Sequence, residues 1–178
     1  SAKLQSHYQR ALQRSETKYR KLTRNPAAVF FQFRMSADGR YSFPFMSETV
    51  KDISGLSAEE VMQDVNAILS RVAPAEQKMF EDRILESAKN LQPFHCVFRS
   101  IVAERTIWVE ARSIPEKLPD GSIIWDGFFF DITEQKSVEK ALRAKTSELE
   151  TYFLSALDLL CIADIEGNFI RVSKEWEK

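Results

Sequence analysis

The sequence has few of the residues on which catalytic and metal sites depend. Its 178 residues include 5 Gly, 2 Cys and 2 His. So few glycines, with no Gly-rich loop among them, argue against a phosphate-binding P-loop. Cys96 and Cys161 are too few and too far apart for a disulfide framework or a CxxC metal knuckle. Both lie in segments of alternating apolar residues, which predicts buried thiols in a reducing cytoplasm.

Long apolar runs are also missing. No stretch reaches the ~18 apolar residues of a membrane-spanning helix, and the N-terminus has no signal-peptide pattern, so we expect a cytoplasmic chain without membrane insertion. The hydrophobic content is nevertheless 44%, with 13 Phe, which is enough for a core. The length predicts one domain of about 100–150 residues with flanking helices.

The N-terminal segment 1–24 is predicted to form an amphipathic, coiled-coil-like helix that ends at Asn25-Pro26. Residues 1–26 carry seven Lys or Arg and one Glu. These basic residues are spread over all faces of the predicted helix, so we expect a solvated helix and no nucleic-acid partner. Its apolar positions near heptad spacing are Tyr8, Leu12, Tyr19 and Leu22.

Five segments with strand-like alternation predict the fold. They are 28–35, 40–45, 93–102, 106–114 and 122–132. Between the second and third lie helical patterns, one opened by a capping box at 57–60 and one by Pro74. Two strands, a helical segment and three further strands predict an α+β fold: a five-stranded antiparallel sheet with short helices on one face.

Large apolar residues from both layers are predicted to meet between sheet and helices. Two interpretations stay open: a cavity for a small, unknown ligand, or a core that these side chains simply fill. The candidate pocket residues are Phe31, Phe33, Phe43, Phe45, Val61, Ile68, Phe80, Phe94, Phe98, Phe128 and Phe130.

The last strand leads almost directly into a charged helix predicted over 134–157. Asp131 or Thr133 is expected to cap it, and Glu134 suits the positive end of its dipole. Its apolar seam is narrow, so we expect it to pair with the same helix of a second copy. The seam residues are Val138, Leu142, Leu149 and Tyr152, with Lys145 as a polar interruption.

The C-terminal segment 158–178 repeats the pattern of 28–50. Asp38-Gly39 corresponds to Glu166-Gly167, 128 residues further on, and each lies between an apolar strand and an aromatic one. This internal repetition predicts an array, with the second copy reaching only its first hairpin in this sequence.

These motifs together resemble the PAS family of sensory domains. The opening "DGRYSFPFMSETVKDISGLSAEEV" is similar to the start of a PAS domain, and "TIWVEARSIPEKLPDGSIIWDGFFFDITEQ" to its C-terminal half. The turn at 103–106 departs from the Asp-Gly or Glu-Gly that is usual there, which leaves its turn type open. The resemblance implies a PAS domain over 25–133, a signalling helix over 134–157, and the truncated start of a second PAS repeat over 158–178.

The resemblance also implies the function. Such a module senses a signal or dimerises, and passes its state through the C-terminal helix to an output domain. We expect a multidomain bacterial protein, first a sensor histidine kinase, with a cyclic-dinucleotide cyclase or phosphodiesterase as the alternative and a ligand-free dimerisation scaffold as another. No catalytic residue and no metal site is predicted.

A haem or flavin cofactor is not predicted either. A haem-binding PAS domain would place a histidine on the long middle helix, which has none, and a flavin-adduct domain would place a cysteine in an Asn-Cys-Arg setting on a helix. His95 and Cys96 lie on a predicted strand instead. Their side chains point to opposite faces of that strand, which also argues against a Cys-His nucleophile.

Overall fold

A computed structural model of the chain describes residues 28–155, 160–173 and 176. The helix predicted over 1–24 lies outside these residues. The chain divides into two compact units, one ending at Thr133 and the other beginning at Glu134. Within the described residues, no helix combines the length and the apolar character needed to cross a membrane.

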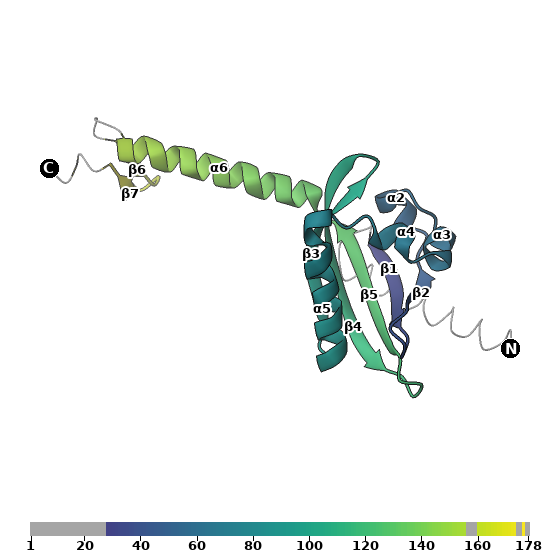
Figure 1. Cartoon of the computed structure of the whole chain (residues 1–178). Helices are drawn as coiled ribbons and strands as arrows, with labels where there is room; N and C mark the ends of the chain where they lie inside the picture. The colour runs from purple at the N-terminus through teal and green to yellow at the C-terminus, as the bar shows by residue number, and fades with distance from the viewer. Residues whose placement is uncertain (1–27, 156–159, 174–175, 177–178) are drawn as a thin grey trace. The chain divides into compact units, whose positions relative to one another are not determined.

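The first unit is built on an antiparallel sheet of five strands in the order β2-β1-β5-β4-β3 (Figure 1). This confirms the predicted sheet. β1 and β5 lie side by side in register from Val29↔Phe129 to Met35↔Ile123, which brings the first and last strands together. The strands are β1 (Val29–Met35), β2 (Tyr41–Met46), β3 (Phe94–Val102), β4 (Arg105–Lys117) and β5 (Ile123–Asp131).

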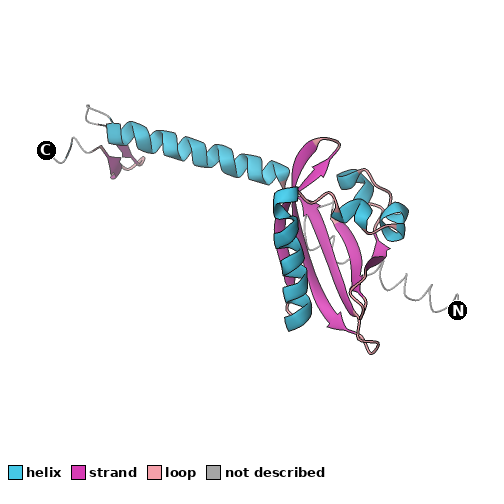
Figure 2. Ribbon diagram, in the orientation of Figure 1, coloured by secondary structure: helices cyan, strands magenta, loops and turns pink. Residues whose placement is uncertain are grey.

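The helices between β2 and β3 cover one face of the sheet (Figure 2). The predicted capping box is present: the Ser57 hydroxyl accepts from the Glu60 amide, and the Glu60 carboxylate accepts from the Ser57 amide. The helical stretch that follows breaks at Asp64, whose backbone is extended and whose carboxylate accepts from the Asn66 amide to start the next helix. The elements are α2 (Val50–Ser54), α3 (Ala58–Gln63), α4 (Asn66–Leu69), η1 (Pro74–Glu76) and α5 (Gln77–Asn90).

Trp125 anchors α5 to the sheet. It is 2% exposed, and its indole Nε1 donates to the Ser87 hydroxyl at 2.9 Å. Ser87 in turn donates to the Gln92 carbonyl at 2.6 Å, so the indole has a satisfied partner inside the core. A buried side chain of this size removes roughly 200 Å² from water, which stabilises the fold by about 5 kcal/mol.

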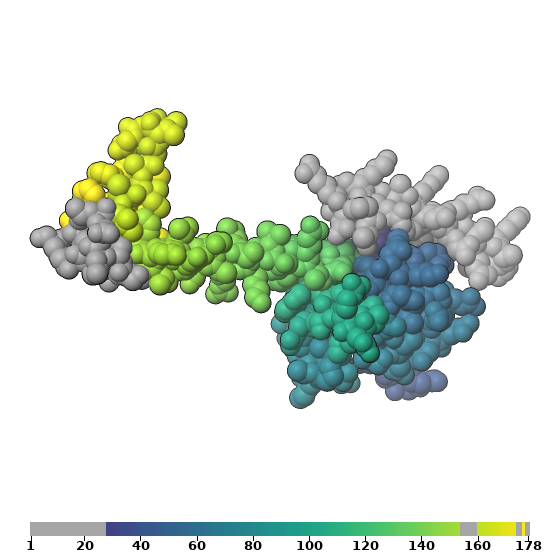
Figure 3. Space-filling view, turned by 90° about the horizontal axis from the view of Figure 1, so that it is seen from above, coloured from purple at the N-terminus to yellow at the C-terminus, as the bar shows by residue number. Residues whose placement is uncertain are grey.

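The second unit consists of α6 (Thr133–Ser155), which starts at the last residue of the first unit, and a hairpin of β6 (Cys161–Ala163) and β7 (Phe169–Val172). Figure 3 shows the α6 side chains standing out along the helix, with the hairpin at its C-terminal end. Phe153 is 8% exposed, and the Arg171 guanidinium lies 5.2 Å from its ring centroid. Cys161 is exposed, so the prediction of a buried thiol is wrong there, because this two-stranded sheet gives it no covering layer.

The two hairpins turn in the same way. In the first, the Ser36 amide donates to the Arg40 carbonyl and the Gly39 amide to the Ser36 carbonyl. In the second, Asp164 takes the place of Ser36, with Gly167 and Asn168 in the other two positions. Both glycines have positive φ, 84° and 88°, a conformation that costs a glycine no steric strain.

Candidate functional site

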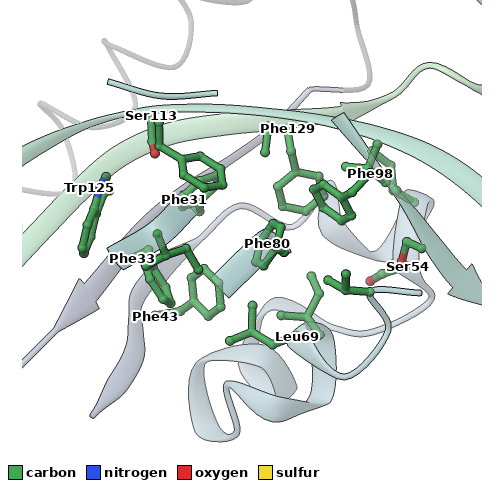
Figure 4. Close-up of a pocket in the computed structure, with 18 of the residues that line it drawn as sticks. Phe31, Phe33, Phe43, Ser54, Leu69, Phe80, Phe98, Ser113, Trp125 and Phe129 are labelled. Carbon is green, nitrogen blue, oxygen red and sulfur yellow. The ribbon is translucent and has the colours of Figure 1, made fainter. Parts of the chain in front are cut away.

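A cavity of about 90 Å³ lies between the sheet and the helices of the first unit. Figure 4 shows the rings of Phe31, Phe33, Phe43, Phe80 and Phe129 directed into one space. The lining residues are Phe31, Phe33, Phe43, Ile53, Ser54, Ile68, Leu69, Val72, Phe80, Ile84, Phe94, Phe98, Ser100, Val102, Ile107, Val109, Ala111, Ser113, Trp125 and Phe129.

Aromatic contacts hold the cavity walls in place. Phe80 of α5 packs against two rings of β3, with centroid distances of 5.7 Å to Phe94 and 4.7 Å to Phe98. On the other side, Phe33 lies 5.5 Å from Trp125 and 5.1 Å from Phe43. Each tilted or edge-on pair contributes about 0.5–1.5 kcal/mol beyond simple burial, so these contacts stabilise the cavity walls.

Seven of the eleven predicted pocket residues line the cavity. They are Phe31, Phe33, Phe43, Ile68, Phe80, Phe94 and Phe98. Val61 is fully buried in the same core but does not reach the cavity.

The prediction is wrong for Phe45, because β2 is bulged. Gln32 pairs with Phe45 and Arg34 with Ser42, so two residues of β2 lie opposite Phe33 alone. The extra residue reverses the alternation, and Met46 rather than Phe45 points into the core beside Phe31.

The prediction is also wrong for Phe128 and Phe130, which lie on the opposite face of the sheet. Phe129 is the residue of this run that lines the cavity. Its neighbours stack on each other at 6.0 Å, and Phe128 lies 6.3 Å from Phe30. In a run of three phenylalanines, either the middle one or the outer two can face the core without changing the apolar pattern. Pairing of β5 with β1 and β4 decides between these two arrangements.

The sequence reasoning missed several cavity residues. Ile107, Val109 and Ala111 alternate along the predicted strand 106–114 and line the cavity, but they are not among the candidate pocket residues. The three serines of the lining carried no apolar signal that could have found them. Leu69 and Ile84 belong to apolar helix stripes, and only the placement of each helix over the sheet shows which members of a stripe reach the cavity.

The junction between β5 and α6 is tied to β4 by two hydrogen bonds. The Ile132 amide donates to the Trp108 carbonyl at 2.8 Å, and the Trp108 amide donates to the Thr133 hydroxyl at 2.9 Å. The Asp131 carboxylate accepts from the Thr133 amide at 2.7 Å and from its hydroxyl. The expected capping by Asp131 is therefore present, whereas the Thr133 oxygen accepts from β4 instead of from the helix. Glu134 lies in the first turn of α6, as expected.

An exposed charged cluster lies on the sheet face away from the cavity. The Glu110 carboxylate contacts His95 Nε2 at 2.8 Å and the Arg112 guanidinium at 2.5 Å. Burial by itself raises the pKa of Glu110, but hydrogen bonds from Arg112 and His95 outweigh it and leave that pKa below its usual value. His95 is thus engaged outside the cavity. No group of three or more His, Cys, Asp or Glu in the described residues could hold a metal ion.

The second unit presents the predicted apolar seam to solvent. Val138, Leu142, Leu149 and Tyr152 are 63%, 68%, 52% and 61% exposed. They follow the alternating four- and three-residue steps of a heptad seam once Lys145 is counted among them. Exposing these apolar side chains to water costs free energy. Packing them against a second apolar surface would remove that cost.

The first unit is therefore an α+β domain whose antiparallel five-stranded sheet carries its helices and an apolar cavity on one face. Residues 43–128 match the family model of the PAS fold, so the first unit has the PAS fold. No curated protein matches it in sequence.

Two solved structures share this fold. One is a sensory box histidine kinase/response regulator from Burkholderia thailandensis, with 16% identity, a TM-score of 0.55, and coverage of 75% of this chain and 98% of the other. The second is the N-terminal domain of a diguanylate cyclase with a PAS/PAC sensor from Marinobacter aquaeolei. It has 14% identity and a TM-score of 0.50, and the match covers 61% of this chain and 98% of that domain.

Proposed function

We propose that this chain is the sensory and dimerisation module of a multidomain bacterial signalling protein, and that it relays the state of its PAS domain through α6. The observation that carries the proposal is the pair of hydrogen bonds between Trp108 and residues 132 and 133. Trp108 lies between Ile107 and Val109, which both line the cavity. A shift of β4 at the cavity therefore changes the position from which α6 starts.

The output of such a relay is a change in how two α6 helices pair. The exposed seam supports pairing with a second copy, because a parallel pair would bury it on both chains. Two packed helices have a small number of stable registers or rotations, so a displacement at their start is transmitted as a switch between packings rather than absorbed. No chemical step in this chain is needed for it.

We further propose a histidine kinase as the parent protein and a cyclase or phosphodiesterase of cyclic dinucleotides as the second candidate. Each is supported by a solved structure of the same fold, a histidine kinase and a diguanylate cyclase. The β6–β7 hairpin, with the same turn as β1–β2, supports a second PAS repeat beginning at 158–178. In this arrangement α6 links two PAS repeats, and the signal passes along it toward the output domain.

Analytical ultracentrifugation of the 178-residue chain tests the relay surface. Leu149→Asp places a charge on the seam and should shift a micromolar dimer toward monomer by at least tenfold in dissociation constant. Ser147→Asp is the matched control, since the same charge then lies at the heptad position farthest from the seam. Equal sedimentation of both variants and the unmodified chain would contradict pairing through α6, and a monomeric unmodified chain would also do so.

A further inference from the structure

The chemistry of the cavity wall restricts what can enter it. None of the twenty lining residues is charged, and the polar ones are Ser54, Ser100, Ser113 and the indole of Trp125. An ionised group would lose its hydration there without gaining a counter-charge, at a cost of several kcal/mol. An occupant must therefore be neutral and mostly apolar.

Two of the four polar groups are already engaged. The Ser54 hydroxyl donates to the Val50 carbonyl at 2.8 Å and accepts from the Leu56 amide at 3.1 Å. The Trp125 Nε1 donates to Ser87 at 2.9 Å. Neither group is available to a ligand without breaking a bond that holds the fold.

The hydroxyls of Ser100 and Ser113 are different. These residues are 8% and 6% exposed, and neither hydroxyl makes a hydrogen bond with any other residue that the structure describes. Among the same residues, no polar side-chain atom is both sealed off from open space and without a partner. The two oxygens therefore border the open volume of the cavity.

Sheet register favours Ser113 as the binding group. Ser113 lies opposite Phe94 on β3 and Gly127 on β5, and Gly127 lies opposite Phe31 on β1. This row across the sheet therefore has two small residues, Ser113 and Gly127, between two phenylalanines. The small side chains leave space above the sheet next to the Ser113 hydroxyl. Ser100 lies six residues further along β3, about 20 Å away, and bridges to Val72.

The volume limits the size of the occupant. At about 90 Å³ the cavity is smaller than the ~150 Å³ of an apolar cavity that binds benzene, and far below the ~300–1,000 Å³ of drug-sized sites. In proportion to benzene, with six non-hydrogen atoms in ~150 Å³, space of this size suits roughly three to five non-hydrogen atoms.

We propose that the cavity binds a small neutral molecule with an apolar body and one hydrogen-bonding atom, and that this atom pairs with the Ser113 hydroxyl. The inference deepens the sensory role proposed above and rests on it for its biological meaning. The binding itself depends only on the first unit.

Methyl NMR of the isotopically labelled 178-residue chain tests this, with butan-1-ol as the probe and butanoate as its charged analogue. Butan-1-ol should produce saturable shifts in the millimolar range at Ala111, the lining residue two positions before Ser113 on β4, and butanoate should not. Ser113→Ala should weaken the alcohol about fivefold, the value of one hydrogen bond. Ser100→Ala, the matched control at the far end, should change the affinity less than twofold.

Non-saturable alcohol shifts would overturn the proposal, as would butanoate binding equal to that of the alcohol, or equal losses in the two serine variants. Folding is checked in the same spectra, and Ser113→Ala breaks no internal hydrogen bond. The experiment distinguishes failure of this proposal from failure of the relay. If the alcohol does not bind but Leu149→Asp still dissociates the dimer, the ligand proposal is wrong and the relay stands. If the alcohol binds but Leu149→Asp has no effect on the dimer, the relay alone is wrong.

Discussion

The hydrogen bond between the Trp108 amide and the Thr133 hydroxyl can be tested by deleting one oxygen. Thr133→Val keeps the shape of the side chain and removes the acceptor. Trp108 and Thr133 are both half-buried, so water replaces the lost partner only in part. An amide left without its acceptor costs about 1–3 kcal/mol when fully buried. Because both residues are partly exposed, we expect a loss of about 1–2 kcal/mol in unfolding free energy. The loss of the Thr133 hydroxyl as a donor to Asp131 adds little to this, because the Asp131 carboxylate is exposed and still accepts from the amide of residue 133.

The assay is thermal and urea unfolding of the chain, together with hydrogen exchange at the Trp108 amide. For a domain of about 100 residues, each kcal/mol lowers the melting temperature by about 4–8 °C, so the valine variant should melt roughly 5–15 °C lower. Thr133→Ser retains the hydroxyl and should stay close to the unmodified chain. If the valine variant melts within about 1 °C of it, or the Trp108 amide exchanges no faster, the reasoning about this junction is wrong.

Three further changes test other parts of the structure. In Gly127→Ala, the new Cβ would lie 2.4 Å from the Ser113 Cβ, so we expect a loss of at least about 2 kcal/mol in urea unfolding, and a normal midpoint would contradict the tight approach of β4 to β5. Glu104 has a φ of 65° in the β3–β4 turn, so Glu104→Gly should raise the unfolding free energy by about 0.5–1 kcal/mol, and a loss would show that the turn is not strained. Burial raises the pKa of Glu76, but hydrogen bonds from Arg99 outweigh this effect and leave the pKa below its usual value. The ionised Glu76 therefore stabilises the fold fully at pH values above the pKa of the unfolded chain. This stabilisation is lost as pH falls through the lower pKa of the folded chain. Glu76→Gln should therefore cost about 1 kcal/mol at pH 7, and the difference should shrink as pH falls through the lowered pKa of Glu76; a difference that does not change with pH would refute this assignment.

Local patterns in the sequence were sufficient for the elements of the fold. The alternation in 28–35 and 93–102 predicted β1 and β3 almost to the residue, and the capping box at 57–60 predicted the start of α3. Gly39 and Gly121, in the turns that follow β1 and β4, both have positive φ, a conformation that glycine adopts without strain. Each of these signals acts between residues that are close along the chain, so it can be recognised without knowing what lies across the sheet.

The departures arose where distant residues decide the outcome. At 103–106 the sequence left the turn type open, and the structure has two consecutive residues with positive φ, 46° and 65°, where Val102 pairs directly with Arg105. The hydroxyl of Thr133 was available to a helix amide by sequence, but an amide 25 residues earlier is its donor. Such choices follow from which groups the fold brings within reach.

The sequence by itself determined the α+β architecture, most of the aromatic cavity wall and the apolar seam of α6, because periodic burial and short-range capping are properties of a single segment. Tertiary structure alone decided that Phe129, not Phe128 or Phe130, faces the cavity. It also decided that the bulge in β2 turns Phe45 away from the core, and that Ser113 lies beside Gly127, where small side chains leave space above the sheet. Pairing between strands fixes which face each side chain takes, and a shift of one residue reverses that face along the whole strand.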